Sequence, residues 1–95
     1  MNQVVLTATL AQMNAIRYTP AGVPAIEFQL EHESQQSEAG QERVVKAAVK
    51  AVAFGALAER VASQHLGSQW QFTGFLASSR NGKSIAFHVT DLSQE

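Results

Sequence analysis

The amino-acid sequence predicts an all-β domain with one short helix. Four stretches alternate apolar and polar residues with a period of two, as strands with one buried face do. One stretch repeats its apolar residues at helical spacing, and the Asn81-Gly82 pair is typical of a tight β-hairpin turn. The chain has 95 residues, a length that suits one small domain. We therefore expect residues 1–95 to form a single domain with a modest core.

The first half of the chain predicts two strands. Residues 4–13 are rich in Val, Thr and Leu and form the first. Residues 14–24 hold two prolines and a glycine, which indicates a loop. Residues 25–34 alternate cleanly, with Ile26, Phe28, Leu30 and His32 on one face, and predict a strand with one solvated face. The polar residues 34–42 that follow predict a mobile connection.

Residues 43–54, with the sequence RVVKAAVKAVAF, are compatible with two structures. As a helix they stack valines on one face. As a strand they place Val45, Ala47, Val49 and Ala51 on the interior face, and Lys46 and Lys50 on the outer face. Alanine favours the helix. Valine and phenylalanine favour the strand, and the Phe54-Gly55 pair provides a break before a separate helix.

The remaining elements follow in order. Residues 55–66 have helical spacing, and Gly67 is a plausible stop. Residues 67–79 predict a strand that carries Trp70, Phe72, Gly74 and Leu76 on one face, and residues 84–92 predict the last strand. If residues 43–54 are a strand, five strands carry one helix between the third and the fourth, which is the order of an OB-fold Greek-key barrel. If they are a helix, a long helical stretch joins two hairpins.

Composition and motifs exclude several classes of function. The formal net charge is −1, so nucleic-acid binding depends on where the few cations lie. The chain has no cysteine, which excludes disulfides and fits a reducing compartment. The sequence shows no signal peptide, no membrane-spanning stretch, no metal-ligand spacing and no phosphate-binding glycine motif. We therefore predict a protein that is not an enzyme and has no catalytic residue, metal site or cofactor.

Several short motifs carry a family likeness. They are NQVVLTATL near the N-terminus, Thr19-Pro-Ala-Gly-Val-Pro24 followed by Phe28-Gln-Leu-Glu-His32, Glu38-Ala-Gly40, Gly74-Phe-Leu76 and Asn81-Gly82. With these motifs, nearly the whole chain resembles the primosomal replication protein N family (PriB). The pairing of the second and third motifs at this spacing is the more specific signal.

The resemblance implies a fold and a function. Residues 43–54 become the third strand of a five-stranded OB-fold barrel. The family is a bacterial, cytoplasmic homodimer that acts at replication forks on the nucleoid and is not an enzyme. It binds single-stranded DNA, and it bridges the restart helicase and the next primosome protein so that the replicative helicase can be reloaded.

An OB-fold binds single strands with cations for the phosphates and flat side chains for the bases. From the resemblance and the local pattern we predict seven DNA-binding residues: Arg17, Tyr18, Arg43, Lys46, Lys50, Arg80 and Lys83. Lys46 falls where better-studied members carry a stacking tryptophan, and Glu33 falls where they carry a basic residue. Together with Glu27 and Glu31, these departures predict weaker and more salt-sensitive DNA binding than in those members.

Other interpretations of the same residues remain open. Lys46 and Lys50 could form a solvated strand face, or pair across strands with Glu31 or Glu33. Tyr18 could pack back on the barrel. The acidic second strand also fits a protein-interaction adaptor of the primosome with residual DNA binding. An RNA-binding module is disfavoured by the low charge and by the lack of an aromatic cluster on strands two and three.

Overall fold

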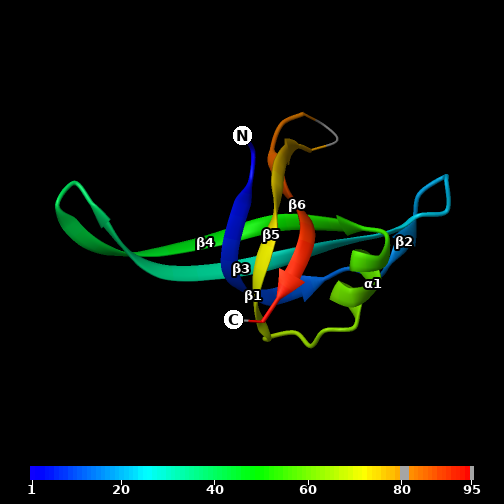
Figure 1. The fold of residues 1–95 in the computed structure, drawn as a ribbon, viewed down its shortest axis with the longest axis horizontal. Coiled ribbons are helices and arrows are strands. Elements are labelled where there is room, and N and C mark those ends of the chain that lie inside the picture. The colour runs from blue at the N-terminus through cyan, green and yellow to red at the C-terminus, as the bar shows by residue number, and fades with distance from the viewer. Residues whose placement is uncertain (80–81, 95) are drawn as a thin grey trace.

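A computed structural model describes residues 1–79 and 82–94 of the chain. Its elements are β1 (Val4–Met13), β2 (Arg17–Tyr18), β3 (Pro24–Glu38), β4 (Gln41–Phe54), α1 (Ala56–Ala62), β5 (Gln69–Ser78) and β6 (Ile85–Ser93) (Figure 1). The ambiguous segment 43–54 therefore lies in a strand. The two-residue β2, inside the segment predicted to be a loop, pairs with the start of β3.

Five of the strands form a closed barrel. The sheet order is β1-β5-β6-β4-β3, and an additional pairing between β1 and β3 closes it. β1 serves both neighbours because its first part pairs with β5 and its last part pairs with β3, with an irregularity between Leu10 and Gln12. β4 and β6 run parallel, and the other barrel pairs are antiparallel. This is the predicted OB-fold, with α1 between the third and fourth barrel strands.

The break between β4 and α1 lies at Gly55. Its backbone has φ 72° and ψ −144°, a combination that L side chains rarely adopt. Its N–H donates to the Pro24 carbonyl at 2.8 Å, which ties the turn to the start of β3. The helix ends at Ala62 and so is shorter than the predicted 55–66, and Leu66 beyond it is 58% exposed. Among the described residues, no helix has the length and hydrophobicity that crossing a membrane requires.

The prediction of a mobile connection at residues 34–42 is wrong. β3 and β4 stay paired out to Glu38 and Gln41, and only Ala39 and Gly40 form the turn. The two strands project from the barrel as a long ribbon, which we call the β3–β4 arm (residues 34–45) (Figure 1). Most of the arm is exposed on both faces, and polar side chains are therefore tolerated in it. The two strands of the arm are held together by the backbone hydrogen bonds between them.

The arm also corrects the predicted interior face of β4. Ala51 is buried in the barrel and Val49 is half-buried, as predicted, but Val45 is only half-buried and Ala47 is exposed. The alternation of residues is as expected. Val45, however, belongs to the arm, which has left the barrel. Ala47 lies just outside the arm and lines a hollow together with Thr7 and Thr9, and neither side chain is part of the core.

The core fills the barrel interior and the contact with α1. Phe28 of β3 and Phe72 of β5 pack with their ring centroids 6.2 Å apart. Phe87 of β6 and Val61 of α1 are also fully buried. Trp70 packs half-buried against this cluster, and its indole N–H donates to Ser68 Oγ at 2.9 Å. Leu76, predicted to share the face of Trp70 and Phe72, is 41% exposed near the end of β5.

Candidate nucleic-acid interface

The outer face of β3 and β4 carries a row of charged and amide side chains. Because antiparallel partners point to the same side, Gln29 lies directly opposite Lys50, and Glu33 lies directly opposite Lys46. Within the described residues neither lysine forms an ion pair. The outer face thus presents two cations along β4 against a row of carboxylates and amides along β3.

A groove of about 1130 Å³ lies over the barrel end of this face. One wall comes from the end of β1 and from β2, and the opposite wall comes from the β5–β6 hairpin, including Ser79 and Ser84. The floor includes Gln29 of β3 and Lys50 and Val52 of β4. In OB-folds this combination of the second and third strands with the two flanking loops is the region that binds oligonucleotides and oligosaccharides.

Two of the predicted DNA-binding residues meet in the groove. Arg17 reaches it from β2, and Lys50 reaches it from β4. The Arg17 guanidinium donates to Glu27 Oε1 at 3.0 Å, with both side chains about half exposed. An exposed ion pair of this kind is worth at most about 1 kcal/mol. The pair is therefore weak enough for a phosphate to displace Glu27.

Lys46 lies further along β4, outside this groove. It lines a second, smaller hollow of about 630 Å³ together with Glu31 and Glu33. His32 borders the same hollow and is held in place on both ring nitrogens, by the Thr7 carbonyl at 2.7 Å and Ser34 Oγ at 2.8 Å. Lys46 thus shares its hollow with two carboxylates and lies opposite one of them, Glu33, whereas Lys50 lies opposite an amide.

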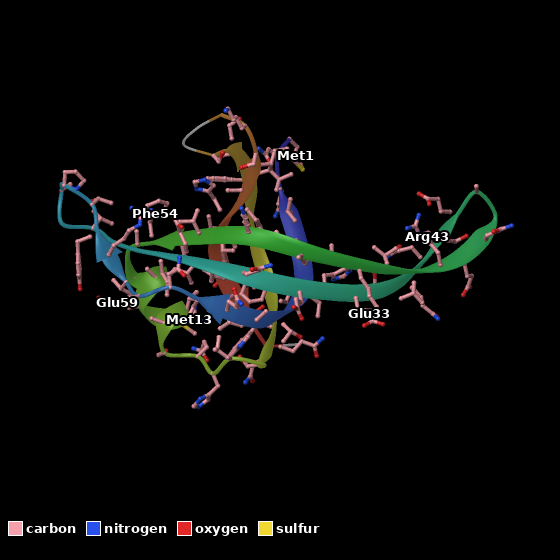
Figure 2. The ribbon with its side chains drawn as sticks, turned by 180° about the vertical axis from the view of Figure 1, so that it is seen from behind. Met1, Met13, Glu33, Arg43, Phe54 and Glu59 are labelled. Atoms are coloured by element: carbon pink, nitrogen blue, oxygen red, sulfur yellow. The ribbon has the colours of Figure 1, made fainter. Side chains whose placement is uncertain are left out.

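Arg43 is separated from the other cations. Alternation along β4 places it on the other face of the β3–β4 arm from Lys46 and Lys50. Figure 2 shows it near the tip of the arm, at the opposite end of β4 from Phe54. Its guanidinium donates to Glu38 Oε1 at 2.6 Å. The fold does not bring Arg43 to the groove.

The remaining predicted residues lie at the margins. Tyr18 is 66% exposed on β2 and does not pack back on the barrel, but it is not among the residues that line the groove. Lys83 is exposed in the β5–β6 hairpin, next to the groove residue Ser84. Arg80 lies outside the described residues.

The predicted site omits aromatic residues that the structure places at the groove. Phe54 of β4 and His88 of β6 both line it, and their ring centroids lie 6.0 Å apart. Alternation could have pointed to Phe54, because it shares the outer face of β4 with Lys46 and Lys50. The sequence held no comparable signal for His88, since its place depends on the parallel pairing of β4 with β6.

Comparison with known proteins places the chain among named relatives. A model of a family described as "another single-strand binding protein family" matches residues 2–91. The replication restart protein PriB of Bordetella pertussis is 46% identical over 80 residues, which cover 84% of this chain and 75% of that protein. The PriB of Nitrosomonas europaea is 37% identical over 91 residues, which cover 95% of this chain and 84% of that protein.

A solved structure agrees as well. The PriB protein of Ralstonia solanacearum superposes with a TM-score of 0.91 at 34% identity, covering 100% of this chain and 98% of the other. The likeness therefore includes the barrel and the chain that surrounds the groove. Together with the matching family model, the relatives at 46% and 37% identity show that this chain belongs to the PriB family of replication restart proteins.

Proposed function

We propose that this protein binds single-stranded DNA across the outer face of β3 and β4 during replication restart. The observation that carries the proposal is the groove that joins Arg17 and Lys50 between the two flanking segments of the barrel. A groove of this kind supplies cations for the backbone of a flexible strand. Family membership and the described similarity to single-strand binding proteins support the same assignment.

The proposed path of the strand runs along β4. Lys46 and Lys50 are four residues apart on one face, which corresponds to roughly 13 Å along a strand. Phosphates of one DNA segment can therefore contact both lysines, while Arg17 closes the groove from β2. Lys83 would contact the strand from the β5–β6 hairpin, and Arg80 stays a predicted DNA-binding residue. Tyr18 would contact it from the edge of β2.

The same face limits the affinity. Glu27, Glu31 and Glu33 alternate along β3 on the side of the two lysines. Each carboxylate repels phosphate and attracts the nearby cations. We therefore propose weak binding that is lost as salt rises, since the cations supply most of the attraction.

The wider role follows from the family. We propose a homodimer that acts in the bacterial cytoplasm at replication forks, without enzymatic activity of its own. In this role it holds single-stranded DNA beside the restart helicase and helps the primosome reload the replicative helicase. The names of the relatives as replication restart proteins support this assignment.

A salt titration tests the DNA-binding proposal. A fluorescein-labelled oligothymidylate is titrated with wild-type protein and with the double variant Arg17→Ala/Lys50→Ala, and anisotropy is followed at several salt concentrations. The double variant should bind more weakly, and its salt slope should fall by about 1.4, because each lost phosphate contact removes about 0.7 on a single strand.

Arg60→Gln provides a charge control for that titration, removing one cation where the double variant removes two. Arg60 lies on α1 and contacts β6 through Asp91 and the Leu92 carbonyl, away from the groove. Its loss lowers the net charge without touching the proposed site. Equal effects of the control and the double variant would refute a local site and leave only a general charge effect.

A second function is favoured by the ion pairs. Arg17 and Arg43 are each paired to a carboxylate, and β3 is acidic, as expected of a surface that binds proteins more than DNA. In this alternative the chain is a primosome adaptor with residual DNA binding. The triple variant Arg17→Ala/Lys46→Ala/Lys83→Ala separates the two functions: unchanged stimulation of the restart helicase by this variant, with DNA binding abolished, would favour the adaptor.

A further inference from the structure

Three aromatic rings form a continuous stack on the outer wall of the barrel. The His88 ring lies between Phe54 and Phe75, with centroids 6.0 Å and 5.0 Å away. The planes are inclined by 24° and 29°, so both contacts are close to parallel. These distances are in the range at which stacked aromatic pairs attract one another.

Strand register explains why the three rings meet. Phe75 of β5 lies directly opposite His88 of β6. In the parallel pairing of β4 and β6, His88 lies beside Val52, and Phe54 is two residues further along β4 on the same face. That face is also the one on which Lys50 lies, four residues before Phe54. The stack therefore crosses three strands and ends beside the cationic part of the groove.

The exposure of Phe54 sets it apart from the other phenylalanines of the sheet. Phe28, Phe72 and Phe87 are no more than 5% exposed, whereas Phe54 is 44% exposed and lines the groove. A large apolar side chain left open beside Arg17 and Lys50 is suited to a ligand with both a flat apolar surface and negative charge. An unpaired nucleotide has both.

The stack also prepares Phe54 for such a ligand. One side of its ring lies against His88, which is itself half-buried and backed by Phe75. A ring held in this way loses little conformational freedom when a ligand binds, and binding is stronger for that reason. The exposed part of Phe54 remains open to the groove.

We propose that Phe54 is a base-stacking platform for single-stranded DNA, with His88 and Phe75 as the residues that position it. The proposal rests on the proposed function and deepens it, since it names a contact to a base where the cations serve only the phosphates. Position 46 carries a lysine, so the flat surface that a single-strand groove needs is supplied at the barrel end of β4 instead.

The test compares one variant that removes an aromatic ring with one that removes a positive charge. Phe54→Leu keeps an apolar side chain but removes the flat ring, and Lys50→Ala removes a cation. Phe54→Leu should weaken binding of an oligothymidylate about five- to 160-fold, the range for losing one stacked base, without changing the salt slope. Lys50→Ala should weaken binding and lower the slope by about 0.7.

Further measurements make the contact specific to a base. An oligomer of abasic deoxyribose phosphates keeps the backbone but has no bases, so wild type and Phe54→Leu should bind it equally. Phe54→Trp, which keeps a flat ring, should bind oligothymidylate at least as tightly as wild type. Leu66→Ala, a change at an exposed apolar residue away from the groove, should leave binding unchanged.

The outcomes separate this inference from the proposed function. If wild type does not bind oligothymidylate even at low salt, the proposed function fails. If Lys50→Ala weakens binding but Phe54→Leu does not, DNA binding stands and the stacking platform is refuted. Equal loss by Phe54→Leu on the abasic and the normal oligomer would also refute it, because the effect would not depend on a base.

Discussion

Glu27 is the residue that would most directly oppose the proposed binding of DNA in the groove. Its carboxylate accepts from Arg17 at 3.0 Å and lines the same groove as Lys50. A phosphate that binds Arg17 must replace Glu27 as its partner. In the proposed complex, the ion pair would therefore compete with DNA for Arg17 and weaken that contact.

The first prediction concerns this competition. Glu27→Gln should strengthen binding of single-stranded DNA about two- to fivefold, because it removes an exposed ion pair and one repelling charge. Anisotropy at a fixed low salt concentration measures the change. Glu59→Gln on α1 makes the same charge change away from the groove and should have a smaller effect. Unchanged or weaker binding by Glu27→Gln would contradict competition for Arg17.

The second prediction concerns Gly74. A Cβ atom added there would overlap the His88 carbonyl oxygen and lie 2.9 Å from Val89 Cα. Both are backbone atoms of β6, so the two strands would have to separate. Gly74→Ala should lower the free energy of unfolding by about 1–3 kcal/mol, as overpacking does, measured by urea denaturation. Gln69→Ala at the exposed start of β5 is the control, and an unchanged midpoint for Gly74→Ala would refute the close approach.

At the scale of single residues, the sequence predicted which face of a strand a side chain lies on better than which other side chains it contacts. The alternation that put Lys46 and Lys50 on the outer face was correct, because a strand has a fixed period of two. The same period put Phe54 on that face. It could not show that His88 lies against Phe54, since these residues are 34 apart and meet only through a parallel pairing.

The β3–β4 arm is the element that departs most from expectation. Its residues lack an apolar face, which in a sequence is typical of a loop. The pairing of β3 and β4 nevertheless continues to the end of the arm, because a two-residue turn connects the strands directly. The turn fixes the register, so the arm needs no buried face. The exposure of the arm explains why Val45, predicted to be interior, does not reach the core; Ala47, just outside the arm, is exposed as well.

The third prediction concerns the turn of this arm. Ala39 and Gly40 have φ values of 52° and 79°, and a positive φ is unfavourable for alanine by roughly 1–2 kcal/mol. Ala39→Asn gives an Asn-Gly turn, which tolerates this conformation. Amide hydrogen exchange in the arm should slow by about threefold to tenfold, and Gln41→Asn, just outside the turn, should not slow it. Equal exchange in Ala39→Asn and wild type would contradict the turn geometry.

At the scale of the whole molecule, closure of the barrel brings distant elements of the chain together. The order of strands and helix predicts an OB-fold only if residues 43–54 are a strand, and it was the family resemblance, not the residue pattern, that decided this. The groove could not be predicted in detail, because β2, the β5–β6 hairpin and the outer face of β4 meet only after closure. For this reason the sequence did not show that Arg17 and Lys50 line the same groove while Arg43 lies on the other face of the arm.

The central claim is that single-stranded DNA lies in this groove. The most direct measurement is a titration of isotope-labelled protein with oligothymidylate, followed by backbone amide chemical shifts. The account predicts that the largest shifts cluster at Arg17, Gln29, Lys50 and Phe54, with small changes at Arg43. Shifts centred on the tip of the arm or on α1, with the groove residues unmoved, would contradict it.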